Sequence, residues 1–302
     1  MRALVIGGAG FIGSNLVDGL IKDNHIVAVW DNLSTGKRND VNPRAHFINC
    51  DVTRGYDARK VLMEKFKPDV VFHLAAKARV QPSIENPIEF NDVNVNGLLN
   101  VLNLCVDCGV KRFVYSSSSS VYGDVEQLPT TEEAPLNPKS PYALQKLIGE
   151  QYCKLYSQLY GLETVCLRYF NVYGERQPTE GAYCLVMGVF AQQLLNGESM
   201  TINGDGTQRR DFTYVGDVVD ANIKCATTKM KWGGDVINIG AGDNRSVNQV
   251  ADLMGGDRIY KDPVIEPKVT KANNGKAKFL LNWKSTTTLE EWIPKWKEQI
   301  GL

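Results

Sequence analysis

The stretch GGAGFIG, residues 7–13, decides the fold. Its first glycine ends the apolar run RALVIG (residues 2–7), and its last lies inside an amphipathic segment that covers residues 11–23. Glycine suits a tight turn whose backbone approaches a ligand closely, and a helix that starts there directs N–H groups and a positive dipole at an anion. We therefore expect Gly7, Gly10 and Gly13 to hold the pyrophosphate of a dinucleotide.

The same alternation of short apolar runs and amphipathic segments continues along the first half of the chain. Continuous apolar runs are typical of strands buried on both faces, and intervening helices make the sheet parallel. The sequence thus predicts an α/β fold, a doubly wound parallel sheet of the Rossmann type, over residues 1–170. Beyond it, longer loops with glycine and proline predict a smaller mixed substrate domain over residues 171–302, with some segments returning to the first. Strands are expected at residues 2–7, 25–31, 45–52, 69–76 and 112–118, and helices at 11–23 and 94–109.

Two acidic positions follow predicted strands and concern the choice of dinucleotide. Asp31 ends the second apolar run, where a carboxylate binds ribose hydroxyls and disfavours a 2′-phosphate. This favours NAD over NADP, although Lys37 and Arg38 nearby are cations that could hold a phosphate. Asp51 and Val52 follow the third apolar run and are expected to flank the adenine.

Composition limits the classes of partner. The 302 residues include 34 basic and 34 acidic side chains, and 43% of the chain is hydrophobic. Without a basic excess we expect no nucleic acid and no anionic membrane as partner, although a local anion pocket is compatible with a neutral chain. The apolar N-terminus is too brief for a signal peptide, and no run is long enough to cross a bilayer. Seven cysteines without framework spacing favour a reducing, cytoplasmic location.

The cysteine and histidine pattern does not favour a metal site. Cys105 and Cys108 form a CxxC, which is compatible with a metal or redox site or with two packing residues of a helix. The second interpretation is preferred because no other cysteine or histidine pair has ligand spacing. The histidines at positions 25, 46 and 73 lie in or beside apolar runs and are expected to be structural.

The run YSSSSSVYG (residues 115–123) could be a flexible linker or could place a hydroxyl for chemistry. Downstream, SPYALQK (residues 140–146) has Tyr142 and Lys146 four residues apart, on one face of a helix. An ammonium beside a phenol stabilises phenolate and lowers a pKa that starts at about 10. A serine at a strand end, a tyrosine and a lysine together favour proton transfer beside the dinucleotide.

With these motifs the chain resembles the extended short-chain dehydrogenase/reductase family, in the branch that epimerises and dehydrates nucleotide sugars. The resemblance covers nearly the whole length. It rests on the segments GGAGFIGS, DNLSTGKR, FHLAA, NVNG, SSSSSVYG, SPYALQK, LRYFNVYG, GDGTQRRDFTYVGDVVDA and NIGAG.

The resemblance implies that Ser118 is the active serine, because it stands three positions before the valine of VYG. In the family's 4,6-dehydratases the next two positions carry Asp and Glu, and in its decarboxylases the second carries Glu. Here they are Ser119 and Ser120, so the pair for elimination is absent, and no cysteine–histidine pair of a 3,5-epimerase/reductase is evident. Ser118, Tyr142 and Lys146 imply C4 epimerisation of a UDP-hexose through a 4-keto intermediate, with NAD regenerated in each cycle.

In that mechanism Tyr142, as phenolate, takes the C4 hydroxyl proton while hydride passes from C4 to the nicotinamide. Ser118 hydrogen-bonds the reacting oxygen, and Lys146 holds the nicotinamide ribose and lowers the tyrosine pKa. Tyr142 and Lys146 are thus also cofactor contacts. The resemblance implies further cofactor contacts at Phe11, Ile12, Asn32, Leu74, Ala75, Ala76 and Asn94.

For the substrate, the resemblance implies contacts from Ser118, Ser119, Asn171 and the phosphate-binding Arg210. A guanidinium suits a diphosphate because it binds two oxygens at once, but Arg210 could instead form a salt bridge with Asp205 or Asp211. Lys77 and Arg79 lie on the loop expected near the cofactor pyrophosphate and could serve either anion or be solvated. Pro263 stands where the family has another arginine, a contact that Lys261, Lys268 or Lys271 could replace.

Counting back three residues from Asn273 gives Thr270 as the residue beside the sugar C2 substituent. By the resemblance, a small residue there leaves room for an N-acetyl group, so UDP-GlcNAc/GalNAc are expected substrates besides UDP-glucose/galactose.

Three other functions are weighed: a UDP-glucuronate 4-epimerase with the same three residues, a catalytically idle dinucleotide-binding regulator, and a net reductase that needs exchangeable NADPH. The intact triad opposes the second, and Asp31 opposes the third. A homodimer is expected by resemblance, through a four-helix bundle of residues 96–109 and 143–161. The second of these helices has more apolar and aromatic residues than one core-facing side requires, which supports the dimer. They are Leu147, Tyr152, Leu155, Tyr156 and Leu159.

Overall fold

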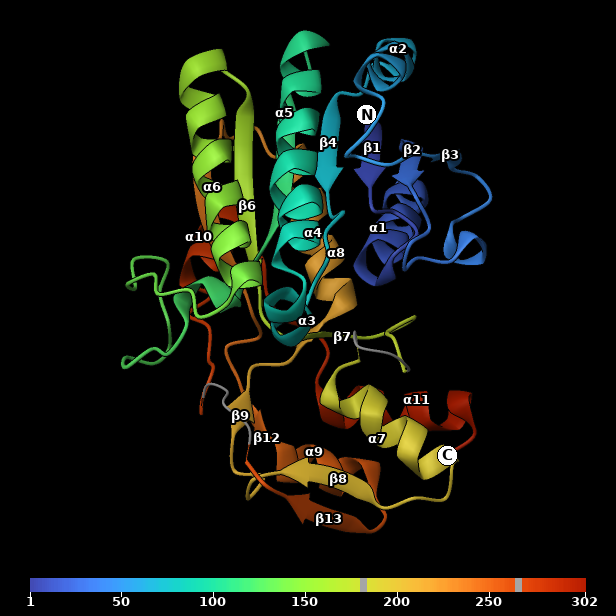
Figure 1. Ribbon diagram of the computed structural model, residues 1–302, viewed down its shortest axis with the longest axis vertical. Helices are drawn as coiled ribbons and strands as arrows, with labels where there is room; N and C mark the ends of the chain where they lie inside the picture. The colour runs from blue at the N-terminus through green and yellow to red at the C-terminus, as the bar shows by residue number, and fades with distance from the viewer. Residues whose placement is uncertain (180–183, 264–267) are drawn as a thin grey trace.

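A seven-stranded parallel sheet forms the centre of the molecule. The computed structural model describes residues 1–179, 184–263 and 268–302. The strand order is β11–β6–β5–β4–β1–β2–β3, and every neighbouring pair is parallel (Figure 1). The order reverses between β1 and β4, which confirms the doubly wound sheet expected from the sequence. The strands are β1 (Arg2–Ile6), β2 (Ile26–Asp31), β3 (His46–Asn49), β4 (Val70–His73), β5 (Arg112–Ser118), β6 (Glu163–Tyr169) and β11 (Gly233–Ile239).

Helices cover both faces of this sheet. Apolar side chains of the strands alternate between two separate cores, because successive residues of a strand point to opposite faces. In β1, for example, Ala3 and Val5 enter one core and Leu4 enters the other. The first core is closed by α1 (Phe11–Lys22), α8 (Val215–Thr227) and α10 (Gly275–Leu281). The second is closed by α2 (Tyr56–Phe66), α5 (Leu98–Asp107) and α6 (Pro141–Tyr160).

The connection from β4 to β5 differs from the single helix expected over residues 94–109. The chain passes through α3 (Val80–Glu85), α4 (Pro87–Asn91) and a π-helical turn, η2 (Asp92–Gly97), before α5 begins at Leu98. Within the π-helical turn Asn94 is only 2% exposed, and its carboxamide bonds to other parts of the protein. The pattern of apolar residues does not reveal this polar packing. The predicted helix therefore began at residue 94, whereas α5 begins at Leu98.

A smaller lobe lies at the carboxyl edge of the sheet (Figure 1). Its core contains Phe190, Ile202, Trp292 and Ile293, all nearly inaccessible to solvent. It includes α7 (Val186–Leu195), α9 (Val247–Met254), α11 (Leu289–Ile300), β7 (Val172–Tyr173), β8 (Met200–Asn203), β9 (Arg209–Arg210), β10 (Thr213–Tyr214), β12 (Arg245–Ser246) and β13 (Arg258–Lys261). Because β11, α8 and α10 pack with the sheet, late segments do return to it; the boundary after residue 170 stays a prediction.

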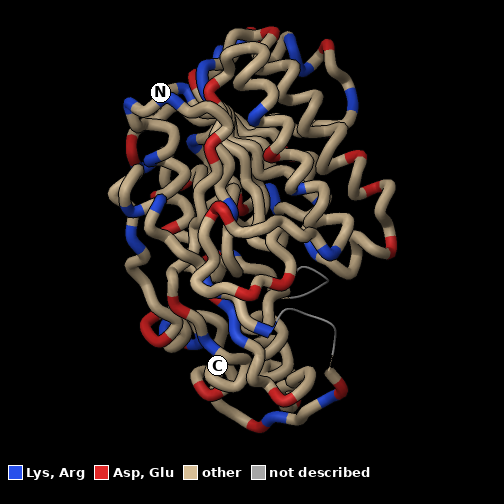
Figure 2. The backbone as a smooth tube through the Cα atoms, turned by 90° about the vertical axis from the view of Figure 1, so that its left-hand side faces the viewer, with Lys and Arg blue, Asp and Glu red and all other residues tan. Residues whose placement is uncertain are grey.

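Charged residues are mixed along both lobes, so that basic and acidic positions alternate along the chain (Figure 2). This distribution agrees with the equal numbers of basic and acidic side chains. Among the described residues, no helix combines the length and apolarity that crossing a membrane requires.

Candidate active site

The glycine-rich turn is packed so tightly that side chains are excluded at two positions. A Cβ on Gly7 would lie 2.6 Å from the backbone nitrogen of Ala75, and one on Gly13 would lie 2.0 Å from the carbonyl oxygen of Gly7. Gly7 also has φ +83°, which favours glycine. By contrast, a Cβ on Gly10 would meet only the Gly7 oxygen, at 3.4 Å. The turn is therefore crowded at Gly7 and Gly13 but open beside Gly10, on the side where a ligand is expected.

Helix α1 starts directly from this turn at Phe11, followed by Ile12. Gly10 is its N-cap, has no side chain to cap the first N–H groups, and no acidic residue lies in the first turn. The N-terminus of α1 thus presents backbone donors and the positive end of its dipole to the open side. This arrangement suits the pyrophosphate of a dinucleotide.

Polar side chains follow β2 and β3 beside the turn. The Asp31 carboxylate accepts the backbone N–H groups of Ala9 (2.9 Å) and Leu33 (2.8 Å), which fixes it against the glycine-rich turn. Asn32 donates to Asp51 at 3.0 Å, so the two residues expected near the adenosine lie together. The neighbouring Val52 is 6% exposed. The guanidinium of Arg38 lies 4.5 Å from the centre of the Phe47 ring, a cation–π contact.

The loop after β4 is held against β1. The N–H groups of Leu74 and Ala75 both donate to the carbonyl oxygen of Ile6, at 2.8 and 2.9 Å, and Ala76 continues this loop. Asn94 supports it from behind: its Oδ1 accepts the Lys77 N–H, and its Nδ2 donates to the Lys77 carbonyl and to Gln145 Oε1. Asn94 was expected to contact the cofactor. Both protons of its side-chain amide instead form hydrogen bonds within the protein.

The serine run is not a linker, because β5 includes Ser116, Ser117 and Ser118. Ser116 Oγ is 3.1 Å from the Tyr169 hydroxyl, and Ser117 Oγ donates to Glu150 at 2.5 Å, so these serines tie the strand to its neighbours. Ser118 ends the strand and caps the following 3₁₀ turn, η3 (Ser119–Tyr122). Its Oγ accepts from the backbone N–H and the hydroxyl of Ser120, at 3.2 and 3.0 Å.

Helix α6 brings Tyr142 and Lys146 to this strand end. Ser140 caps the helix by accepting the Ala143 N–H at 3.1 Å. The phenol of Tyr142 lies against the Ser118 side chain, with which it can form a hydrogen bond. Lys146 Nζ donates to the Ser116 carbonyl oxygen at 2.8 Å and lies 5.9 Å from the centre of the Tyr142 ring. The structure therefore brings Ser118, Tyr142 and Lys146 together at the carboxyl edge of the sheet.

The electrostatics of Tyr142 differ from the sequence-based expectation that Lys146 lowers its pKa. Burial raises the pKa of Tyr142 from its ordinary value, and the opposing influences are the Ser118 hydrogen bond and the positive charge of Arg79. The Lys146 ammonium is directed at the Ser116 carbonyl instead. Burial lowers the pKa of Lys146 to about 8. Arg79, expected only near the pyrophosphate, is thus a charge that acts on the phenol; its φ of +94° marks a strained backbone.

The expected substrate contacts gather around Asp211 in the smaller lobe. Asn171 Nδ2 donates to the Asp211 carbonyl at 3.3 Å, and the Asp211 N–H donates to Thr270 Oγ1 at 3.1 Å. The neighbouring Arg210 donates to the Arg209 carbonyl at 2.9 Å. The Asp211 carboxylate is inaccessible to solvent and binds the backbone N–H groups of Ala241, Gly242 and Ala272.

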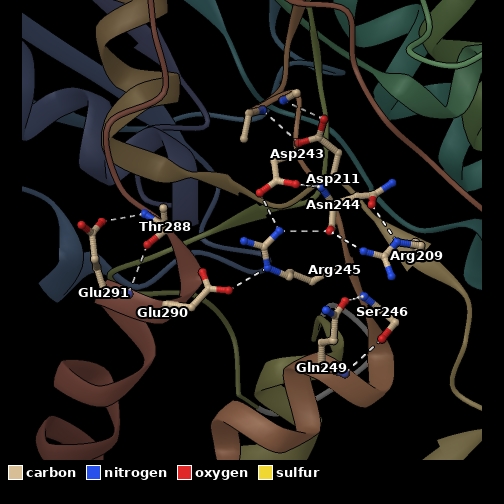
Figure 3. A network of polar contacts seen from close by, with 12 residues as sticks. Arg209, Asp211, Asp243, Asn244, Arg245, Ser246, Gln249, Thr288, Glu290 and Glu291 are labelled. Carbon is tan, nitrogen blue, oxygen red and sulfur yellow. Dashed lines mark hydrogen bonds and ion pairs between the residues drawn. The ribbon is translucent and has the colours of Figure 1, made fainter.

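Asp211 was missed as a site residue in the sequence, although RRDF places it between Arg210 and an apolar residue. Burial raises its pKa to about 7, while its three backbone donors oppose this shift. Figure 3 shows Asp211 with two of its backbone donors beside a polar network that joins Asp243, Asn244 and Arg245 to Glu290 at the start of α11. This network fixes the loop beside Arg210 and Thr270.

The cysteines and histidines form no metal cluster among residues 1–179, 184–263 and 268–302. Cys105 is buried in α5 and Cys108 is partly exposed at its end. His73 stacks between Phe113 and Tyr115, and burial lowers its pKa to about 3, so it is neutral at physiological pH.

Known proteins match this chain along its length. The model of the NAD dependent epimerase/dehydratase family matches residues 3–240. A putative UDP-glucose 4-epimerase of Methanocaldococcus jannaschii is 42% identical, over 97% of this chain and 96% of its own. A UDP-glucose 4-epimerase of Thermotoga maritima, solved with UDP-glucose, superposes with a TM-score of 0.93 at 36% identity, over 99% of this chain and all of its own.

A third relative was solved with both ligands. It is a UDP-glucuronic acid 4-epimerase of Bacillus cereus in complex with UDP-glucuronic acid and NAD, with a TM-score of 0.90 at 32% identity, over 100% of this chain and 99% of its own. The glycine-rich turn, the Ser118–Tyr142–Lys146 cluster and these matches agree with one another. The chain therefore belongs to the NAD dependent epimerase/dehydratase family.

Proposed function

We propose that the protein is a nucleotide-sugar 4-epimerase that interconverts UDP-hexoses at C4 and uses bound NAD. The observation that carries this proposal is the hydrogen-bonded pair of Ser118 and Tyr142, with Lys146 beside it, at the sheet edge where the glycine-rich turn opens. Such edges are where α/β sheets bind ligands. Asp31 at the end of β2 supports NAD rather than NADP.

The glycine-rich turn and Asp31 would hold NAD, which would supply a reversible hydride acceptor for C4 of the sugar. Tyr142 takes the proton of the C4 hydroxyl and later gives it back, and Ser118 holds the reacting oxygen by a hydrogen bond. Lys146 contributes a positive charge close to the phenol, and Arg79 contributes a second one. Arg79 favours the phenolate over the neutral phenol. The Lys146 ammonium, which donates to the Ser116 carbonyl, is proposed to hold the nicotinamide ribose.

In a 4-epimerase the 4-keto hexose has to rotate within the site while the nucleotide stays bound. We assign the diphosphate to Asn171, which follows the end of β6, and to Arg210 on β9 of the smaller lobe. Ser119, at the start of η3 beside Ser118, is assigned to the sugar. If the diphosphate is bound more tightly than the sugar, the 4-keto hexose can present either face to the nicotinamide.

The proposal is tested by incubating purified protein, without added NAD, with a panel of UDP-sugars and separating C4 epimers by chromatography. UDP-glucose and UDP-galactose are expected to interconvert. If only UDP-glucuronate is converted, the substrate is a carboxylated sugar and not a neutral hexose. The positive charge of Arg79 near Tyr142 is the feature that would favour such a sugar. Bound NAD without any turnover would indicate the non-catalytic regulator, and a requirement for added NADPH would indicate a net reductase.

Thr270 is proposed to set the size limit at the sugar C2 position. Its hydroxyl is held by the Asp211 N–H, which keeps the small side chain in one orientation. We expect activity on UDP-GlcNAc and UDP-GalNAc as well as on the unsubstituted pair. Thr270→Tyr should selectively lose the N-acetylated pair, and an unchanged ratio of the two kcat/KM values would show that Thr270 is not the gate.

A homodimer is proposed through α5 and α6. Tyr156, one of the residues that suggested it, is 7% exposed and bonds to Asn103, so it belongs to the protein's own core. Leu155 and Leu159 are 42% and 63% exposed, and Tyr160 beside them is also exposed. Leu147 and Tyr152 are half-buried against the cores.

We expect the wild type to sediment as a dimer at micromolar concentration and Leu159→Glu to shift it toward the monomer. A charged side chain in a buried apolar interface carries a large desolvation cost. Sedimentation of the wild type as a monomer at this concentration would contradict the dimer.

We also propose a cytoplasmic location. The seven cysteines lack the spacing of a disulfide framework, which is typical of proteins in a reducing compartment.

A further inference from the structure

We propose that Glu150 is a positioning residue of the active site, which locks α6 to β5 and β6 and holds its carboxylate one helical turn from Lys146. The inference rests on the proposed epimerase function and adds a buried group that touches none of the reacting atoms. No motif in the sequence singled out Glu150 or its partner Arg168.

The contacts of Glu150 form a closed, buried cluster. Glu150 Oε1 accepts from Ser117 Oγ at 2.5 Å and from Arg168 Nε at 2.8 Å, and Oε2 accepts from Arg168 Nη2 at 2.6 Å. The side chains of Arg168 and Glu150 are 3% and 2% exposed. The Arg168 guanidinium also lies 4.6 Å from the centre of the Tyr122 ring. A bidentate pair of this kind fixes both distance and orientation.

Each element joined by this cluster carries a candidate functional residue. Ser117 directly precedes Ser118 on β5, and Arg168 on β6 is three residues before Asn171. Glu150 is one helical turn beyond Lys146 on α6. A shift of α6 along the sheet would move Tyr142 and Lys146 away from Ser118, and the cluster opposes that shift.

Stability alone does not account for a buried pair here. A buried ion pair often adds little stability, because the desolvation cost of both charges offsets their attraction. A second ion pair, Arg112 on β5 with Glu163 on β6, lies at the opposite end of these strands, at 2.5 Å. There the side chains are 12% and 27% exposed, and no candidate catalytic residue is adjacent. Only the pair at the carboxyl edge is fully buried and next to the site.

The second role concerns the charge of Lys146. Burial disfavours its ammonium, and Glu150 is the strongest influence that raises its pKa again. Lys146 itself bonds to a neutral group, the Ser116 carbonyl oxygen. Titratable groups that face Lys146 come from β4, β5 and α6, and they are His73, Tyr115, Tyr142, Glu150 and Cys153. Of these, Glu150 is the one carboxylate, and it forms an ion pair with Arg168.

The test is Glu150→Gln, which keeps the size and most hydrogen bonds but removes the charge. We expect the pKa of Lys146 to fall by about 1 unit or more, so the alkaline limb of kcat moves to lower pH. The sign follows because a weaker counter-charge makes the ammonium easier to deprotonate. We expect kcat to fall while KM for the UDP-sugar changes little. The pKa is read directly from the ¹³Cε signal of Lys146 in the NAD-bound protein, assigned with Lys146→Arg.

Two further variants separate positioning from folding. Glu163→Gln is the matched control, and it should leave the Lys146 pKa and kcat as in the wild type. The double variant Glu150→Gln, Arg168→Met also removes the buried cation that Glu150→Gln leaves unpaired. Its thermal stability should therefore return toward that of the wild type. The lowered pKa of Lys146 and the lowered kcat should remain. Wild-type values of both quantities in the double variant, or in a folded Glu150→Gln variant, would overturn the proposal.

The outcome for Glu150 does not depend on finding the right sugar. If the wild type epimerises no UDP-sugar, the proposed function fails, but the NMR titration still reports whether Glu150 sets the charge of Lys146. If the wild type is active and the titration is unchanged by Glu150→Gln, the proposed function stands and the role of Glu150 is wrong.

Discussion

Replacement of Tyr142 by phenylalanine is expected to lower kcat for UDP-hexose epimerisation by about 10²–10⁴-fold, the usual contribution of a positioned acid–base group. The change removes one hydroxyl, and this hydroxyl is the one that pairs with Ser118. The start of α6 should be preserved, because Tyr142 bonds to Ser83 through its backbone N–H, at 3.1 Å. The ring can still pack in place, so the loss would report chemistry and not folding.

The measurement is steady-state kinetics with UDP-galactose, together with the melting temperature and the NAD content of the purified variant. Tyr56→Phe is a suitable control, since its hydroxyl bonds to Asp107 at the surface of α2 and α5. It should keep wild-type kcat. Retention of more than about a hundredth of the activity by Tyr142→Phe would remove Tyr142 as the acid–base residue.

Gly13→Ala is expected to abolish the retention of NAD, which should otherwise co-purify with the wild type. A redox-neutral cycle has no need to release its cofactor, so we expect bound nucleotide in protein purified without added NAD. The new methyl group would lie 2.0 Å from the Gly7 carbonyl oxygen, which is backbone and cannot rotate away. The turn must then move, at a cost of about 2–4 kcal/mol, equivalent to roughly 30–1000-fold in Kd.

Nucleotide released on denaturation and titration calorimetry with NAD would measure this effect. Gly233→Ala is the matched control, because a Cβ there meets no atom within 4 Å. It should retain NAD as the wild type does. Equal NAD content in Gly13→Ala and Gly233→Ala would show that the glycine-rich turn does not hold the cofactor.

The sheet and the cluster at its edge could be predicted from the sequence because their signals are local. Apolar runs mark β1, β2, β4 and β5, and the spacing of Tyr142 and Lys146 places them on one helical face. The pairing of α6 with Ser118 followed only from the resemblance to a family, since no local pattern shows which helix meets which strand end.

The hydrogen-bond partners of the polar residues that support the site could not be predicted, even for Asn94, which the resemblance had placed at the cofactor. Asn94, Asp211 and Glu150 each satisfy groups far away in the chain, such as Lys77, Ala272 and Arg168. Their partners are decided by tertiary packing, and a polar residue inside a helix or loop usually indicates an exposed position. The raised pKa of Tyr142 was missed for the same reason, because burial is a property of the folded chain.

The place of β11 beside β6 has a consequence for how the chain is made. β6 ends at Tyr169, but the strand that covers its edge is formed only by Gly233–Ile239. A nascent chain that has emerged through residue 170 therefore exposes an unpaired strand edge and an apolar face that α8 and α10 will later cover. About seventy more residues must leave the ribosome before the sheet is complete, which takes several seconds at ordinary translation rates. During that interval the half-built sheet is the state most exposed to aggregation and to chaperones.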